Sequence, residues 1–281
     1  MFKRSAVLMA VMVCVLLAAG AKAEMRKDIE FSKPGGFSLT LDAYVPDGKG
    51  PFPTVIIVHG GGFARGDKQT YVPPLFEPLS QAGFTWFTIN YRMNPQFKFP
   101  APVDDIEAAI AFVKAHAAEY KVDLKRVVLM GESAGGALVS FVGVKNQSAI
   151  KLAAVVPFYG VHDWQQRAEQ EEAGLVGPSI WREFFSVSPG KSPEAIKRMK
   201  EISAVTYIKK GLPPFLLIHS TTDEQVNYQQ SVVMQQRMKA AGNTCDLITV
   251  QGAKHGMSII TNFPDTKVQM IAWLKKTLKL N

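Results

Sequence analysis

Cysteine is scarce in this chain, with two in 281 residues, and this excludes a disulfide framework. Cys14 lies in an N-terminal segment that we expect to be removed, so Cys245 has no partner and is predicted to be a buried structural thiol. No spacing of cysteines and histidines fits a metal site, and neither a metal nor an organic cofactor is expected. Low-complexity runs and fixed-period repeats are also missing, which argues against a disordered or repeat protein.

Clusters of like charge are missing as well. The 32 Lys and Arg against 24 Asp and Glu give a formal net charge of +8, but the basic residues are scattered along the chain. No nucleic-acid partner is therefore expected. The composition, 47% hydrophobic and 20% charged, suits one large globular domain with a substantial core. Nothing in it indicates an oligomeric state.

The apolar run near the N-terminus, residues 6–18, is shorter than the roughly 20 residues that a membrane-spanning helix needs. Two basic residues precede it and a small-x-small sequence, Ala-Lys-Ala, follows at residues 21–23. This layout predicts a signal peptide over residues 1–23 and a mature domain over residues 24–281. We therefore expect a periplasmic or secreted protein without a stable membrane anchor after cleavage. The cleavage removes three basic residues and lowers the formal charge from +8 to 8 − 3 = +5.

Short apolar runs alternate with helical patterns along the mature chain. The predicted strands cover residues 37–45, 54–58, 84–89, 126–130, 152–156, 215–218 and 246–250, and the predicted helices cover residues 103–117, 134–146, 226–241 and 265–279. This alternation predicts an α/β fold, with a mostly parallel sheet of about eight strands and helices on both faces. Residues 161–200 interrupt it with a polar, tryptophan- and phenylalanine-containing segment that lacks a strand pattern. We expect this segment to be a small helical cap inserted over the strand ends.

One serine stands among small residues at the end of a predicted strand. Residues 131–135 read Gly-Glu-Ser-Ala-Gly and fit the G-x-S-x-G pattern of a nucleophile elbow, with a strand before it and a helix after it. Glycines on both sides of such a turn avoid a collision of side chains. The pattern predicts that Ser133 is a nucleophile, and that the N–H group of Ala134 at the helix N-terminus stabilises an oxyanion.

A glycine-rich loop directly follows the predicted strand at residues 54–58. It reads His-Gly-Gly-Gly-Phe from His59 and matches the HGGG sequence of lipases and esterases. Glycines leave backbone N–H groups open to a substrate, so Gly61 and Gly62 are predicted to complete the oxyanion hole with Ala134. His59 is expected to order this loop rather than to act as a base.

A nucleophilic serine needs a base and an acid that orients the base. In folds with a G-x-S-x-G elbow, the three catalytic residues follow one another along the chain in the order serine, acid, histidine. Of the five histidines, this order leaves His219 and His255 as candidate bases. His219 would have to precede its own acid, so His255 is the predicted base. Asp223 follows the strand at residues 215–218 and is the predicted acid, with Glu224 and Asp163 as its nearest competitors.

These segments carry a family resemblance that extends over nearly the whole mature chain. The matching sequences are HGGGF at residues 59–63, NYRM at 90–93, FPAPVDD at 99–105, GESAGG at 131–136, HSTTDEQVNYQQS at 219–231 and GAKHG at 252–256. The chain resembles the hormone-sensitive-lipase-like esterases and the related bacterial acetyl xylan and feruloyl esterases. The resemblance implies the α/β-hydrolase fold. The chain has His-Ser-Thr-Thr-Asp at 219–223 where family members often have His-Gly-x-x-Asp, but position 223 still matches the acid.

The sequence thus predicts a secreted serine carboxylesterase that hydrolyses short-chain acyl esters on a small molecule or a polysaccharide. The resemblance implies acetyl or feruloyl esters of plant polysaccharide as candidate substrates. Three alternatives remain open. A lipase for longer acyl chains would use the cap aromatics as an acyl pocket, whereas these aromatics could equally pack on the sheet. A prolyl-oligopeptidase-like serine peptidase shares the elbow but normally carries a large N-terminal domain, and about 30 residues precede residue 54 in the mature chain. A non-catalytic ligand-binding relative would have lost one of the three predicted catalytic residues.

Overall fold

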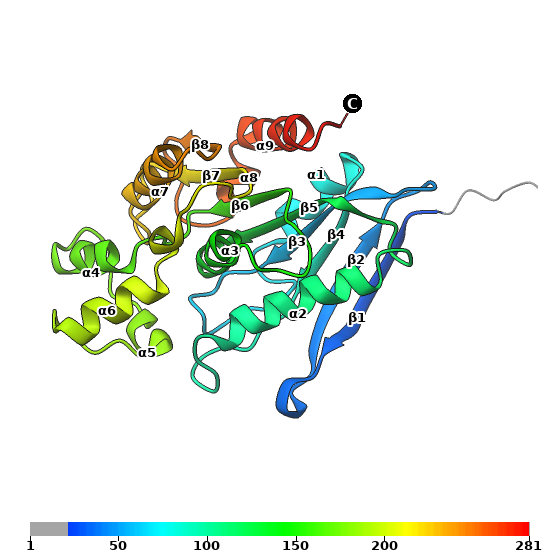
Figure 1. The fold of residues 1–281 in the computed structure, drawn as a ribbon. Helices are drawn as coiled ribbons and strands as arrows, with labels where there is room; N and C mark the ends of the chain where they lie inside the picture. The colour runs from blue at the N-terminus through cyan, green and yellow to red at the C-terminus, as the bar shows by residue number, and fades with distance from the viewer. Residues whose placement is uncertain (1–21, 281) are drawn as a thin grey trace, which may run out of the picture.

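The computed structural model describes residues 22–280. The predicted signal peptide, residues 1–23, lies outside the described residues except for its last two positions. Within residues 22–280, eight strands form a single sheet in the order β1-β2-β4-β3-β5-β6-β7-β8 (Figure 1). β2 pairs antiparallel with both β1 and β4, and the remaining neighbours pair parallel. The predicted mostly parallel sheet of an α/β-hydrolase fold is confirmed.

The strands are β1 (Glu24–Ser32), β2 (Leu39–Val45), β3 (Phe52–Val58), β4 (Thr85–Ile89), β5 (Val122–Glu132), β6 (Ala154–Phe158), β7 (Phe215–Ser220) and β8 (Cys245–Val250). The α-helices are α1 (Phe76–Gln81), α2 (Ala101–Ala115), α3 (Ala134–Lys145), α4 (Trp164–Glu172), α5 (Trp181–Phe185), α6 (Pro193–Ile202), α7 (Gln229–Ala240), α8 (Ser258–Thr261) and α9 (Pro264–Thr277). No helix within residues 22–280 has the length and apolar composition that crossing a membrane requires.

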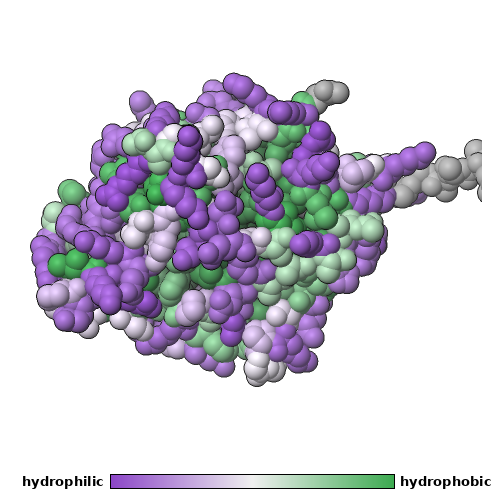
Figure 2. All heavy atoms as spheres, in the orientation of Figure 1, coloured by the Kyte–Doolittle hydropathy of each residue, from purple (hydrophilic) through white to green (hydrophobic). Residues whose placement is uncertain are grey.

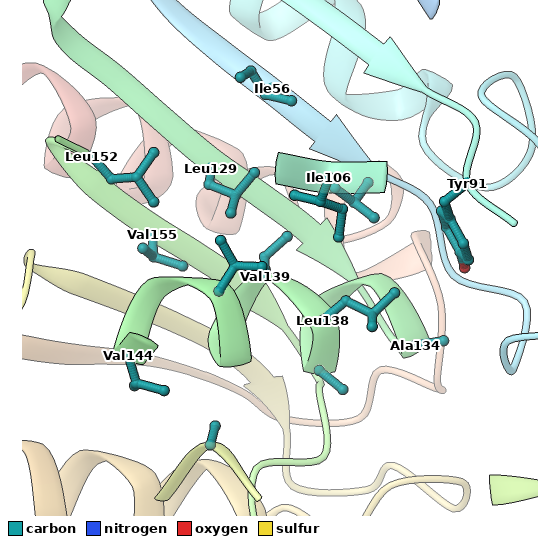
Figure 3. Close-up of a cluster of buried hydrophobic side chains, with 14 of the residues drawn as sticks. Ile56, Tyr91, Ile106, Leu129, Ala134, Leu138, Val139, Val144, Leu152 and Val155 are labelled. Carbon is teal, nitrogen blue, oxygen red and sulfur yellow. The ribbon is translucent and has the colours of Figure 1, made fainter. Parts of the chain in front are cut away.

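The central strands are buried on both faces, which explains their continuous apolar sequences. In β3, Val55 and Ile57 belong to one buried cluster, while Ile56 and Val58 belong to another on the opposite face. Successive side chains of a strand point to opposite faces, so both faces must be covered by helices. Side chains of α2, α3 and α7 pack on one face, and those of α1, α8 and α9 pack on the other. Figure 3 shows Val139 of α3 beside Leu129 and Val155 of the central strands.

The structure differs from the predicted elements at positions where tertiary contacts determine whether a strand or helix forms and where it begins. β1 was not predicted, because its residues are mainly polar and exposed; its backbone pairs with the edge of β2, with two breaks in register. The predicted strand at residues 152–156 lies two residues later, as β6. The predicted helix at 226–241 begins only at Gln229, because the preceding residues form a loop around Asp223.

The segment at residues 161–200 contains α4, α5 and most of α6, and no strand. Figure 1 shows these three helices grouped together beside the sheet.

The face of the molecule in Figure 2 is mainly hydrophilic, with apolar residues in separate patches. The apolar side chains of the inserted helices are largely turned inward: the four aromatics of this segment, Trp164, Trp181, Phe184 and Phe185, are all buried.

Candidate active site

Ser133 occupies the sharp turn between β5 and α3. Its backbone has φ 53° and ψ −116°, a positive-φ conformation that few non-glycine residues adopt. The neighbouring glycines are required by close packing: a Cβ at Gly131 would lie 2.6 Å from the carbonyl oxygen of Gly135. A Cβ at Gly135 would overlap the carbonyl oxygen of Val58 on the adjacent strand. The turn therefore holds the serine side chain out from the sheet, as the G-x-S-x-G pattern predicts.

The structure brings the side chains of Ser133, His255 and Asp223 together although they are far apart in the sequence. His255 Nε2 lies 2.9 Å from Ser133 Oγ, and His255 Nδ1 lies 2.7 Å from Asp223 Oδ2. A carboxylate only accepts hydrogen bonds, so Nδ1 carries the proton and Nε2 is left to accept the hydroxyl proton of the serine. This arrangement can remove a proton from Ser133 while Asp223 supports the positive charge that forms on His255.

Asp223 is held as an ionised acceptor by several donors. Its Oδ1 accepts the backbone N–H groups of Gln225 and Val226, at 2.8 and 2.9 Å. His219 Nε2 lies 3.4 Å from Asp223 Oδ2, the oxygen that also contacts His255, and donates to the carbonyl oxygen of Val226. Burial alone would raise the pKa of Asp223, but the contacts with His219 and His255 outweigh it and hold this pKa well below its usual range.

Within residues 22–280, none of the competing residues contacts Ser133 or replaces Asp223 as the partner of His255. Glu224 faces the pocket beside the serine, but its side chain makes no hydrogen bond with His255 among the described residues. Asp163 caps the N-terminus of α4 by accepting the N–H groups of Gln165 and Gln166. His219 contacts the same oxygen of Asp223 as His255 does, and its ring nitrogens bind Val226 and Ser231 rather than Ser133. Asp163 and His219 therefore make structural contacts, and Glu224 lines the pocket without contacting His255.

The glycine loop lies against the same pocket as the serine. Gly61 and Gly62 line the pocket and have positive φ, 96° and 64°. In the described part of the chain their N–H groups donate no hydrogen bond. Ala134 also lines the pocket and is the first residue of α3, where backbone N–H groups have no acceptor within the helix. The three predicted oxyanion-hole residues are thus beside Ser133, with N–H groups free to bind an anion.

Tyr91 holds the glycine loop in place, a role that the sequence did not predict. Its hydroxyl donates to the carbonyl oxygens of His59 and Gly60, at 3.1 and 3.0 Å. His59 Nδ1 donates to the same Gly60 oxygen at 2.8 Å, and its ring stacks on Tyr91 with centroids 4.3 Å apart. Burial lowers the pKa of His59 to about 4, so the ring is neutral and orders the loop, as predicted. Only the pattern NYRM pointed to Tyr91.

A cavity of about 600 Å³ opens above Ser133. Its walls come from the glycine loop, the elbow, the loops carrying Glu224 and His255, and the inserted helices. Of the inserted aromatics, Trp164 and Trp181 line the cavity. Phe184 instead stacks on Phe63, the residue after the glycines, with ring centroids 4.3 Å apart. The insertion therefore forms one wall of the cavity and also packs on the glycine loop.

Within residues 22–280, no group of three or more His, Cys, Asp or Glu side chains could hold a metal ion. Cys245 is buried and unpaired, as its strand position predicted, and burial raises the pKa of its thiol to about 12. A thiol with so high a pKa stays protonated at neutral pH and is a poor nucleophile. Among the described residues, Ser133 is the nucleophilic side chain that combines a cavity with a neighbouring base.

Comparison with known proteins identifies relatives of this chain. The BD-FAE family profile matches residues 41–238, a segment that contains Ser133 and Asp223 and ends before His255. LipM and the esterase LipC of Mycobacterium tuberculosis are 30% and 27% identical to it over 194 and 222 residues. These segments cover 65% and 75% of this chain but 44% and 54% of the relatives. The chain therefore spans about half the length of the curated relatives it matches.

Two solved structures share its fold. A truncated carbohydrate esterase from gut microbiota is 24% identical, with a TM-score of 0.78 over 91% of this chain and 96% of that one. A thermophilic esterase from Thermogutta terrifontis, solved with propionate bound, is 26% identical, with a TM-score of 0.72 over 90% of this chain and 94% of that one. The residues that the BD-FAE profile matches make up more than two thirds of this chain. The chain therefore belongs to the BD-FAE family, and its fold is that of the esterase-like α/β-hydrolases.

Proposed function

We propose that this protein is a serine carboxylesterase in which Ser133, His255 and Asp223 form the catalytic triad. The observation that carries the proposal is the continuous line of hydrogen bonds from Ser133 Oγ through both ring nitrogens of His255 to Asp223 Oδ2. This line lies at a cavity and beside free backbone N–H groups, which are the parts that acyl transfer needs. Membership of the BD-FAE family supports the same reaction.

The reaction follows from these positions. His255 Nε2 takes the hydroxyl proton as Ser133 Oγ attacks the ester carbonyl, and Asp223 stabilises the imidazolium that forms. The negative charge that develops on the carbonyl oxygen is bound by the N–H groups of Gly61, Gly62 and Ala134. The intermediate then collapses, and the alcohol leaves with the proton from His255. Water, activated by the same histidine, releases the acid from Ser133.

The substrate class is a short-chain acyl ester. Within the insertion at residues 161–200, the large apolar side chains exposed to solvent are Leu175 and Ile180, while the aromatics are buried. A lid that opens on lipid droplets would need a broad apolar face, and this insertion does not present one. The bound propionate of the Thermogutta terrifontis esterase supports a short acyl group. The resemblance to acetyl xylan and feruloyl esterases supports acetyl or feruloyl groups on plant polysaccharide.

Hydrolysis of p-nitrophenyl esters of increasing acyl length tests this proposal. We expect kcat/KM to be highest for acetyl to butyryl esters and to fall steeply for longer chains, since the insertion presents no broad apolar face to a long acyl chain. Acetylated xylan and methyl ferulate belong in the same series. A maximum at ten or more acyl carbons, or activation at an oil–water interface, would identify the protein as a lipase instead.

We also propose that the protein acts outside the cytoplasm. The support is the order of features in residues 1–23: basic residues, an apolar run and the small-x-small sequence. Expression of the full chain in a bacterial host should yield esterase in the periplasm or the medium, with a mass that corresponds to a chain beginning at Glu24. An uncleaved chain that stays in the cytoplasm would contradict the proposal.

A further inference from the structure

Glu132, which stands directly before the serine of the elbow, makes a contact with the glycine loop. Glu132 is the last residue of β5, and only 3% of it is exposed. Its Oε1 accepts the backbone N–H of Gly60, the first glycine of the glycine loop. A Cβ at position 60 would overlap the carboxyl group, so this contact requires glycine there. One side chain thus ties the elbow to the loop.

This contact and those of Tyr91 and His59 hold two successive peptides of the glycine loop. Glu132 holds the peptide between His59 and Gly60 through its N–H. The carbonyl of the following peptide, between Gly60 and Gly61, is held by Tyr91 and His59. In a trans peptide the N–H points away from the C=O. Because both peptides are held, the N–H of Gly61 can point in one direction only. That direction is opposite to the Gly60 carbonyl that Tyr91 binds.

We propose that Glu132 is a positioning residue for ester hydrolysis: its ionised carboxylate fixes the glycine loop so that the N–H groups of Gly61 and Gly62 meet the tetrahedral intermediate. The inference rests on the proposed function. Hydrogen bonds to an ionised acceptor are roughly twice as strong as neutral ones. The carboxylate therefore holds Gly60 more firmly than the protonated acid does.

The surroundings place this ionisation near neutral pH. The titratable groups that face Glu132 are the phenols of Tyr91 and Tyr159 and the imidazole of His255. No Lys or Arg within residues 22–280 forms an ion pair with it. Burial raises the pKa of Glu132 to about 7, against the opposing influence of His255 and the Gly60 N–H. The carboxylate that holds the loop thus forms as the pH rises through about 7.

The test compares wild type with Glu132→Gln and Glu132→Ala across pH 5 to 9, using p-nitrophenyl acetate. Gln can still accept the Gly60 N–H but carries no charge, while Ala removes the contact.

Because an oxyanion hole acts in the transition state, the losses should fall on kcat with KM within about threefold. We expect kcat to fall about a hundredfold in Glu132→Ala at pH 8, in line with the loss of one oxyanion-hole donor, and about tenfold in Glu132→Gln, which keeps a neutral acceptor. The matched control is Glu107→Gln on α2, a half-buried carboxyl whose pKa is also raised by burial but which lies away from the cavity.

The ratio of wild-type to Glu132→Gln kcat is the decisive quantity, because the two proteins differ only in the carboxyl group at this position. The ratio should be near one below pH 6 and rise with a midpoint near pH 7. A ratio that is constant with pH, or a kcat of Glu132→Gln within twofold of wild type at pH 8, would overturn the inference. If the wild type itself hydrolysed no ester, the proposed function would fail instead, so the two failures are distinguishable.

Discussion

At the scale of single residues, the site contains conformations and charges that cost stability. Ser133 has a positive φ, and backbone strain of this kind costs on the order of 1–3 kcal/mol. Glu132 beside it is a buried carboxyl without a cationic partner among the described residues. Such features persist where the surrounding packing enforces them, and here glycines at 131 and 135 allow that packing. The costs are concentrated at the residues to which we assign the chemistry.

Glu132→Gln should therefore stabilise the fold in a pH-dependent way while it lowers activity. The pKa of Glu132 is raised from 4.5 to about 7 in the folded state, so the unfolded chain ionises first. Below pH 4.5 the acid is protonated in both states and costs nothing. As the pH rises from 4.5 to about 7 the folded protein loses stability, by roughly 3 kcal/mol in total at about 1.4 kcal/mol per pKa unit, and above 7 the loss is constant.

Urea unfolding of both proteins at pH 5 and pH 8 measures this difference. The advantage of Glu132→Gln over wild type should be larger at pH 8 by roughly 2 kcal/mol, because most of the ionisation lies between these two values. An advantage that is equal at both pH values would mean that the carboxyl is not kept protonated by burial.

At the scale of elements, the sequence predicted what local patterns determine. The central strands were recognised because burial on both faces demands a continuous apolar run, as in β3. β1 was missed because its pairing with β2 involves the backbone and leaves its polar side chains in solvent. The start of α7 was misplaced because Asp223 binds the N–H groups of the two residues that would open a longer helix. Tertiary contacts of this kind leave no local pattern.

The same distinction applies to the site. Ser133 and the glycines could be predicted because a tight turn restricts residue type within a few positions of the chain. His255 and Asp223 could be predicted from chain order and position after strands. Tyr91 and Glu132 could not be assigned a role, because each acts on the glycine loop from 31 to 72 residues away in the sequence. Position 132 is a variable position of the pattern G-x-S-x-G, and nothing local marks its contact with Gly60.

At the scale of the whole molecule, the sheet positions the catalytic residues and the insertion completes the cavity. The sheet brings the ends of β3, β5 and β7 together, and these carry the glycine loop, the serine and the loop of Asp223. The insertion between β6 and β7 closes one side of the cavity with Trp164 and Trp181. It also anchors the glycine loop through the stacking of Phe184 on Phe63. The cavity is thus shaped by both parts, and its substrate preference depends on how the insertion packs.

The most direct test of the central claim is to locate the covalent intermediate. A p-nitrophenyl alkylphosphonate reacts with an activated serine and leaves the phosphonyl group on its Oγ, with release of p-nitrophenol. Mass spectrometry of peptides from the treated protein should place one phosphonyl group on Ser133, with loss of esterase activity in proportion to labelling. Ser133→Ala should take up no label and should hydrolyse no ester, while His255→Ala should be labelled far more slowly. Stoichiometric labelling of another residue, or an active Ser133→Ala, would contradict the account.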